Sequence, residues 1–191
     1  MSIVSNISPL APKNFPIMHS ISGVRFATAN AGIKSGNSED ATLILLEPET
    51  VIAGLFTSSM TRSAPVIDCQ NKIGINVEKT GAAIIVNSGN ANAFTGRHGE
   101  LAVREIIAEL STRVQIPVER IFSSSTGVIG ELLEYQKIIN VFDYLVDSLH
   151  VSKIENAARA IMTTDTFPKG SSVKVSSSGG KITISGIAKG S

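Results

Sequence analysis

Tryptophan is absent from this chain, and cysteine occurs only once, at position 69. A single cysteine excludes a framework of internal disulfides and is typical of proteins in a reducing compartment, so we expect a cytoplasmic protein. As a nucleophile Cys69 would need a basic partner, and no histidine lies near it in the sequence. Buried, unreactive thiols are far commoner than catalytic ones, so we interpret Cys69 as a packed residue.

Charges and long apolar runs are also scarce. Charged residues make up 17% of the chain, the formal net charge is +1, and lysine and arginine form no block, which argues against a nucleic-acid partner. No apolar run reaches the roughly 20 residues that span a bilayer. The stretch up to Pro16 lacks the regions of a secretion signal. The three histidines are scattered, so we predict neither a metal site nor membrane association.

The first half of the chain alternates short apolar runs with turn residues. Residues 1–20 carry three prolines and predict an irregular lead-in. Residues 41–46 and 51–57 flank a short stretch that contains proline, which predicts two strands joined by a turn. Residues 82–86 form a continuous apolar run closed by asparagine, serine and glycine, a pattern typical of a strand buried on both faces.

The second half contains helical patterns. Apolar residues recur at helical spacing over about residues 98–114 and 134–149, and an alanine-rich third helix is expected over about 152–162. Ile121-Phe122 begins a short strand that breaks into serines. Alternating apolar residues on both sides of Gly179-Gly180 predict a hairpin with one solvated face.

Strands and helices are therefore mixed without strict alternation. This favours an α/β (α+β) layered sandwich, with mixed sheets and flanking helices, over a doubly wound parallel sheet. The sequence contains no linker and no internal repeat, so we expect residues 1–191 to form a single domain. The last residues predict a strand with a glycine-bounded exit, and the backbone groups of such a strand need partners. We therefore expect a missing C-terminal half that completes both the sheet and the chemistry.

Two polar stretches follow predicted strands, where α/β proteins place their sites. Residues 87–96 hold three asparagines that can bond backbone groups, and taken alone they favour a structural loop before a helix over a binding site. Their glycine spacing matches neither a dinucleotide fingerprint nor a P-loop. Residues 123–131 place hydroxyl groups beside glycine. This pattern suits either an oxyanion hole, with a side-chain donor and a backbone N–H aimed at one point, or a serine-rich capping turn.

Two further features could hold a small ligand. Residues 162–169 combine three threonines and an aspartate before Pro168. Their hydroxyls could bind a polar molecule, or they could simply end a helix through local bonds. Lys189 could project from a strand end toward a carboxylate as a point charge, or it could be an ordinary solvated lysine.

Five segments carry a wider pattern: GIKSGNSEDATLILLEPETVIAGLFTSSMTRSAPV, IIVNSGNANAFTG, IFSSSTGVIGE, AARAIMTTDTFPK and ISGIAKGS. Together and in this order they closely resemble the ornithine acetyltransferase family, the bifunctional glutamate N-acetyltransferases of arginine biosynthesis. The resemblance covers nearly the whole chain after about Ile21. It implies that this chain is the α chain of a precursor that cuts itself before a threonine, a short way after the lysine of the AKGS block.

The resemblance also implies a reaction. In this family the new N-terminal threonine begins a β chain and takes acetyl from N-acetylornithine, releasing ornithine, and then passes the acetyl group to glutamate. The free α-amine of a threonine can serve as the base for its own hydroxyl. The family assembles as two α and two β chains. No cofactor is implied, and acetyl-CoA stays open as a second acetyl donor.

By the same resemblance, the Thr126 side chain and the Gly127 backbone N–H would form the oxyanion hole. Thr163 and Lys189 would contact substrate, with Lys189 facing its carboxylate, and the adjacent Thr164 competes with Thr163 for that role. Two other interpretations stay open. One is a related self-processing hydrolase or aminopeptidase that uses water as acceptor. The other is a binding module that holds a small amino acid without chemistry.

Overall fold

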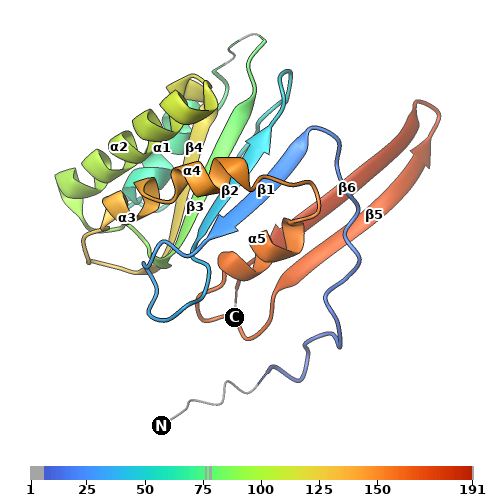
Figure 1. Ribbon diagram of the computed structural model, residues 1–191, viewed down its shortest axis with the longest axis horizontal. Coiled ribbons are helices and arrows are strands. Elements are labelled where there is room, and N and C mark those ends of the chain that lie inside the picture. Colours follow the sequence, from blue (N-terminus) through green and yellow to red (C-terminus); the bar gives the residue numbers. More distant parts are fainter. Residues whose placement is uncertain (1–6, 76, 78, 191) are drawn as a thin grey trace.

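The computed structural model describes residues 7–75, 77 and 79–190. The strands are β1 (Val24–Ala29), β2 (Ala41–Leu46), β3 (Ala82–Asn90), β4 (Ile121–Val128), β5 (Lys169–Ser177) and β6 (Gly180–Ala188). The helices are α1 (Ala64–Lys72), α2 (Gly96–Val114), α3 (Tyr135–Ile139), α4 (Phe142–Asp147) and α5 (Ile154–Ala160), with a short 3-10 helix at Val118–Arg120. Figure 1 shows a sheet with helices packed across it and a long hairpin, β5–β6, at one side.

The main sheet is mixed, in the order β1-β2-β3-β4. The pairs β1–β2 and β2–β3 are antiparallel, whereas β3 and β4 run parallel and are joined by the α2 crossover. Because β3 and β4 are parallel, both strands end at the edge of the sheet where β1 ends and β2 begins. The polar stretches that follow the apolar parts of β3 and β4 therefore lie side by side at one edge.

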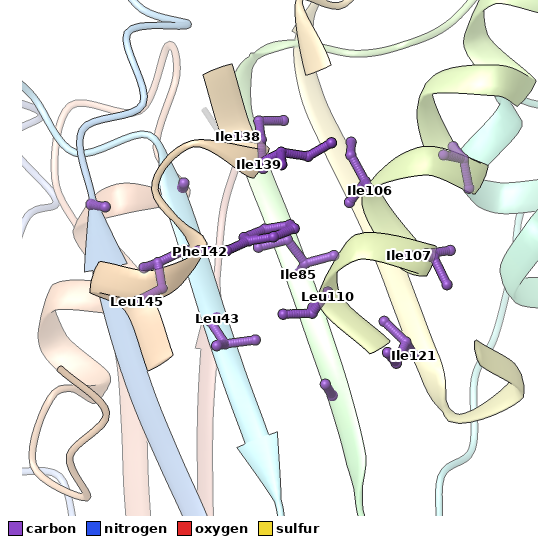
Figure 2. Packing of buried hydrophobic residues seen from close by; sticks show 14 of the residues in the cluster. Leu43, Ile85, Ile106, Ile107, Leu110, Ile121, Ile138, Ile139, Phe142 and Leu145 are labelled. Carbon is purple, nitrogen blue, oxygen red and sulfur yellow. The ribbon is translucent and has the colours of Figure 1, made fainter. Parts of the chain in front are cut away.

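One face of the sheet is covered by α2, α3 and α4. Helix α2 presents apolar residues at spacings of three and four, and these pack against alternate residues of the strands. Its last turn ends at Gln115, which adopts a left-handed conformation with φ of 56°. Figure 2 shows this core, in which the fully buried ring of Phe142 lies between the strands and α2. Its labelled members are Leu43, Ile85, Ile106, Ile107, Leu110, Ile121, Ile138, Ile139, Phe142 and Leu145.

The opposite face is covered in part by α5, which packs over β1 and β2. Phe26 of β1 contacts Ile154 and Ala157 of α5, with Ile187 of β6 at the edge of this smaller cluster. The β5–β6 hairpin extends beyond the sheet (Figure 1). The predicted layered mixture of sheets and flanking helices is thus confirmed.

Of the two strands predicted over residues 41–46 and 51–57, only the first is present. Residues 41–46 form β2, but residues 51–57 have no regular structure, and Val51 and Leu55 are exposed. The physical reason is that both edges of β2 are already paired, one with β1 and the other with β3. Residues 7–20 are irregular apart from turns, as predicted, whereas residues 1–6 of that lead-in lie outside the described part of the chain.

The remaining differences concern where elements begin and end. Helix 98–114 is confirmed as α2, but the helix predicted over 134–149 is broken at Asn140-Val141 into α3 and α4. This break lets the chain pass from α2, which α3 contacts, to β1, which α4 contacts. The third helix is shorter than predicted, at Ile154–Ala160, and α1 was not predicted.

The strands β3 and β4 both continue through their polar residues, to Asn90 and Val128, where loops were predicted. Their parallel pairing persists from Ala83↔Ile121 to Gly89↔Gly127, with an irregularity at Asn90. The hairpin around Gly179-Gly180 is confirmed as β5–β6. Its apolar face, however, is half exposed in the part of the chain that the structure describes, so solvent reaches both faces.

Candidate functional site

The end of β4 brings Thr126 and Gly127 against the end of β3. Thr126 lies opposite Ser88, and Gly127 lies opposite Gly89. Gly127 has a φ of 138°, and a Cβ atom built there would lie 2.3 Å from the carbonyl carbon of Gly89. Only glycine fits this close approach of two backbones. Thr126 is half-buried and Gly127 is exposed, so solvent reaches both residues.

Buried asparagines hold this strand end in place. Asn87 donates from Nδ2 to the Asn90 carbonyl at 2.9 Å and accepts a bond from Ser125 Oγ at 2.6 Å. Asn90 in turn donates to the Glu131 carbonyl and accepts from the Asn92 N–H. The asparagine-rich stretch therefore serves as the framework of the edge, which agrees with the structural interpretation of residues 87–96.

A contact between β3 and the end of helix α5 brings the segment that carries Thr163 to the same edge. The buried Ser88 hydroxyl donates to the Ala160 carbonyl at 2.6 Å, at the end of α5. Three residues later, Thr163 is half-buried, whereas the adjacent Thr164 is exposed. Because Ser88 also lies opposite Thr126, it joins the end of β4 to the segment that carries Thr163.

Lys34 reinforces this junction, although it was not among the predicted site residues. Its Nζ donates to the carbonyls of Ala160 at 3.5 Å and Met162 at 3.3 Å. Its loop is shaped by the buried Asp40 carboxylate, which accepts three backbone N–H bonds from residues 31–34. Burial lowers the pKa of the Lys34 ammonium, against the opposing effect of the Asp40 and Glu39 carboxylates.

The Asp165 carboxylate contacts the remaining predicted site residues, Thr163 and Lys189. Its carboxylate accepts the backbone N–H of Thr163 at 3.2 Å and of Gly190 at 2.5 Å. The Lys169 ammonium donates to it at 3.1 Å, and the Lys189 ammonium lies 3.6 Å away. The structure thus brings the predicted residues Thr163 and Lys189 together around one buried carboxylate.

The four predicted residues lie in two groups, and the chain that leaves α5 connects one group to the other. Thr126 and Gly127 end β4, Ser88 links them to Ala160, and Asp165 links Thr163 to Lys189. Helix α5 contacts β6, the strand that Lys189 and Gly190 follow, in agreement with these contacts. Hydroxyl, backbone N–H and ammonium groups are the kinds of donor that bind carboxylates and a developing oxyanion.

Asp165 and Ser88 were visible in the sequence but could not be assigned. Asp165 lies inside the threonine-rich motif, and Ser88 inside the asparagine-rich one. Their partners, Gly190 and Ala160, are 25 and 72 residues away, so no local pattern indicates these bonds.

Other candidate groups do not join this site. Cys69 is buried and donates from Sγ to the Ser123 carbonyl at 3.2 Å, and burial raises the pKa of its thiol, so it is an inert thiol as expected. Within the described ranges, no three His, Cys, Asp or Glu side chains gather as they would to hold a metal ion. No helix among those same residues is long and apolar enough to cross a membrane.

Comparisons with known proteins give a consistent result. Residues 25–191 match the family model described as the ArgJ family. The arginine biosynthesis bifunctional protein ArgJ of Ruegeria pomeroyi is 48% identical over 191 residues, which are 100% of this chain and 47% of the relative. This chain therefore spans about half the length of the curated relatives it matches.

Solved structures agree. The crystal structure of arginine biosynthesis bifunctional protein ArgJ from Bacillus halodurans matches with a TM-score of 0.80 and 30% identity, over 89% of this chain and 87% of that chain. Ornithine acetyltransferase from Mycobacterium tuberculosis, solved in complex with ornithine, matches with a TM-score of 0.79 and 30% identity, over 89% of each chain.

Proposed function

The chain belongs to the ArgJ family, and we propose that it is the α chain of a glutamate N-acetyltransferase of arginine biosynthesis. The enzyme would transfer acetyl from N-acetylornithine to glutamate. The single observation that carries this proposal is the junction at the end of β3 and β4. There Ser88 connects the Thr126–Gly127 strand end to the segment that leads to Thr163, Asp165 and Lys189.

In this proposal the nucleophile lies outside the chain, on a threonine that begins a β chain from the same precursor. The threonine hydroxyl attacks the acetyl carbonyl of N-acetylornithine, and the α-amine of the same threonine accepts the hydroxyl proton. The carbonyl oxygen then becomes an oxyanion. The Thr126 hydroxyl and the Gly127 N–H would donate to it, each contributing roughly 3–4 kcal/mol in the transition state.

Collapse of this intermediate breaks the amide bond. Ornithine leaves with the proton, and the acetyl group remains on the threonine as an ester. The amine of glutamate then attacks the ester carbonyl, passes through the same oxyanion site, and leaves as N-acetylglutamate with the threonine hydroxyl restored. Thr163 and Lys189 would hold the amino-acid part of either substrate, with the ammonium of Lys189 facing a carboxylate.

The same proposal implies a partner chain, an oligomeric state and a cellular location. The β chain would complete the active site and the sheet, and two copies of each chain would form an α2β2 heterotetramer. No cofactor is needed for acetyl transfer between these substrates. A cytoplasmic location fits the buried, unpaired thiol of Cys69.

The proposal is tested with the full-length precursor that carries this chain. N-acetylornithine labelled in its acetyl group is mixed with glutamate, and products are followed by mass spectrometry. We expect equal amounts of ornithine and labelled N-acetylglutamate. Labelled acetate instead would show water as the acceptor and make the protein a hydrolase, whereas no turnover would contradict any catalytic function. Acetyl-CoA in place of N-acetylornithine tests for a second donor in the same assay.

A further inference from the structure

Asp165 is unusual because its two carboxylate oxygens serve two different parts of the site. Oδ1 accepts the Gly190 N–H at 2.5 Å and the Lys169 ammonium at 3.1 Å. Oδ2 accepts the Thr163 N–H at 3.2 Å and lies 3.6 Å from the Lys189 ammonium. One side of the carboxylate therefore holds the chain just beyond β6, and the other side holds Thr163 and the Lys189 side chain.

The carboxylate itself is closed off from solvent, with its side chain 1% exposed. Burial alone would raise the pKa of Asp165. The bonds from Gly190, Thr163 and Lys169, with the charge of Lys189, outweigh burial and hold this pKa well below its usual range. The group is therefore ionised at neutral pH, and it is too enclosed to contact a substrate directly.

The geometry requires a carboxylate rather than any polar side chain. Among the residues that the structure describes, donors approach both oxygens, two on each side. An asparagine at this position would keep one acceptor oxygen and would turn its NH2 group toward donors on the other side. Either Gly190 and Lys169 or Thr163 and Lys189 would then lose an acceptor.

We propose that Asp165 is a positioning residue that fixes Thr163 and Lys189 for substrate binding and sets the path of the chain after Gly190. This inference rests on the proposed function. In the proposed precursor the segment after Gly190 leads to the bond that is cut, so the Asp165–Gly190 bond would align that segment for self-cleavage. Asp165 would thus act in two steps, maturation and substrate binding, without touching the reacting atoms.

Two variants test this role in the full-length precursor. Asp165→Asn removes the second acceptor with little change in side-chain volume. Gly190→Ala acts from the other side of the same bond. Gly190 has a φ of 153° and is exposed, so an alanine there disfavours the bonded backbone conformation without disturbing the core. The matched control is Asp68→Asn, which removes a carboxylate that pairs with Lys72 within helix α1 at 2.8 Å.

Self-cleavage is followed on denaturing gels, and KM and kcat are measured on the mature enzyme. For Asp165→Asn we expect self-cleavage at least about tenfold slower than in the unmodified precursor. We also expect KM for both amino-acid substrates to rise roughly tenfold to a hundredfold, with a smaller fall in kcat because the β4 end is untouched. Gly190→Ala should slow self-cleavage in the same direction, and Asp68→Asn should match the unmodified protein.

The outcomes separate the inference from the function on which it rests. An unmodified precursor that neither cleaves nor transfers acetyl would overturn the proposed function before any variant is compared. If the unmodified enzyme is active while Asp165→Asn and Gly190→Ala both cleave and bind as it does, the positioning role is wrong. If Asp165→Asn does not fold, Gly190→Ala decides: slower cleavage supports the role, and an unchanged rate overturns it.

Discussion

Single residues at the end of β4 carry the chemical part of this account. Thr126 is half-buried at the end of the strand, beside the exposed Gly127. In an oxyanion hole, a donor contributes mainly when negative charge develops, so its loss changes kcat more than KM.

We expect Thr126→Ala to lower kcat by roughly 100- to 1,000-fold while KM changes little. Ser124→Ala is the matched control, because Ser124 is exposed on the same strand two residues earlier and so shares its face. Steady-state kinetics on the mature enzyme provide the measurement. A loss of equal size in both variants would show that the strand, rather than the Thr126 hydroxyl, is responsible.

Asp165 gives a pH dependence of stability whose sign follows from its lowered pKa. A carboxyl group with a folded-state pKa below its unfolded value of about 3.9 stabilises the folded protein above that pH. The stabilisation is lost as the pH falls through the folded-state pKa. The groups that face this carboxylate are the ammonium groups of Lys169 and Lys189.

The difference in melting temperature between the unmodified protein and Asp165→Asn should therefore be constant from pH 8 to about pH 5 and shrink below about pH 4. Thermal unfolding across this range measures it. A difference that already shrinks between pH 7 and pH 5 would mean that Asp165 is protonated near neutrality, against the geometry of its bonds.

At the scale of elements, the parallel pair β3–β4 depends on the contact between Gly127 and Gly89. A methyl group on Gly127 would meet backbone atoms of β3 at 2.3–2.5 Å, and backbone atoms cannot move aside as a side chain can. Gly130 has a comparable left-handed backbone, with φ of 87°, but nothing lies within 4 Å of a Cβ built there.

Comparing the two glycines therefore separates backbone strain from steric overlap. We expect Gly127→Ala to lower the free energy of unfolding by about 1–3 kcal/mol more than Gly130→Ala, because only the former adds overlap to the strain. Chemical denaturation measures both values. If both variants lose the same free energy of unfolding, then β3 and β4 can move apart at Gly127 without a free-energy penalty.

The same scale explains what could be predicted from the sequence. Helix α2 was predictable because its apolar residues repeat with helical spacing over 19 residues. Residues 51–57 were predicted as a strand from an apolar run that follows a turn, but β2 already pairs with β1 and β3 and leaves them no edge. The polar ends of β3 and β4 were predicted as loops. They continue as strands with the help of bonds such as that between Ser125 and Asn87, which are 38 positions apart, and no local sequence pattern indicates such a bond.

At the scale of the whole molecule, the β5–β6 hairpin leaves an apolar face open to solvent. The lead-in covers part of one of its faces, where the backbone of His19 bonds the hydroxyls of Ser172 and Ser185. The cross-strand pair Val173 and Ile184 lies on the other face, with 50% and 57% of these residues exposed. We expect the proposed β chain to cover this apolar face.

This predicts that Ile184→Ser weakens association of the two mature chains roughly tenfold or more. Lys174→Ser is the control, because Lys174 is exposed on the opposite face of β5. Gel filtration of the co-expressed chains over a dilution series measures the association. Equal behaviour of the two variants would mean that another surface joins the chains.

The central claim is that this chain works with a second chain whose first residue is an acetyl-accepting threonine. Intact-mass spectrometry of the purified full-length product, after incubation with N-acetylornithine alone, tests it most directly. The account predicts two chains, of which the second begins with threonine and gains the mass of one acetyl group that glutamate then removes. A single uncut chain, or an acetyl group on any other residue, would contradict the account.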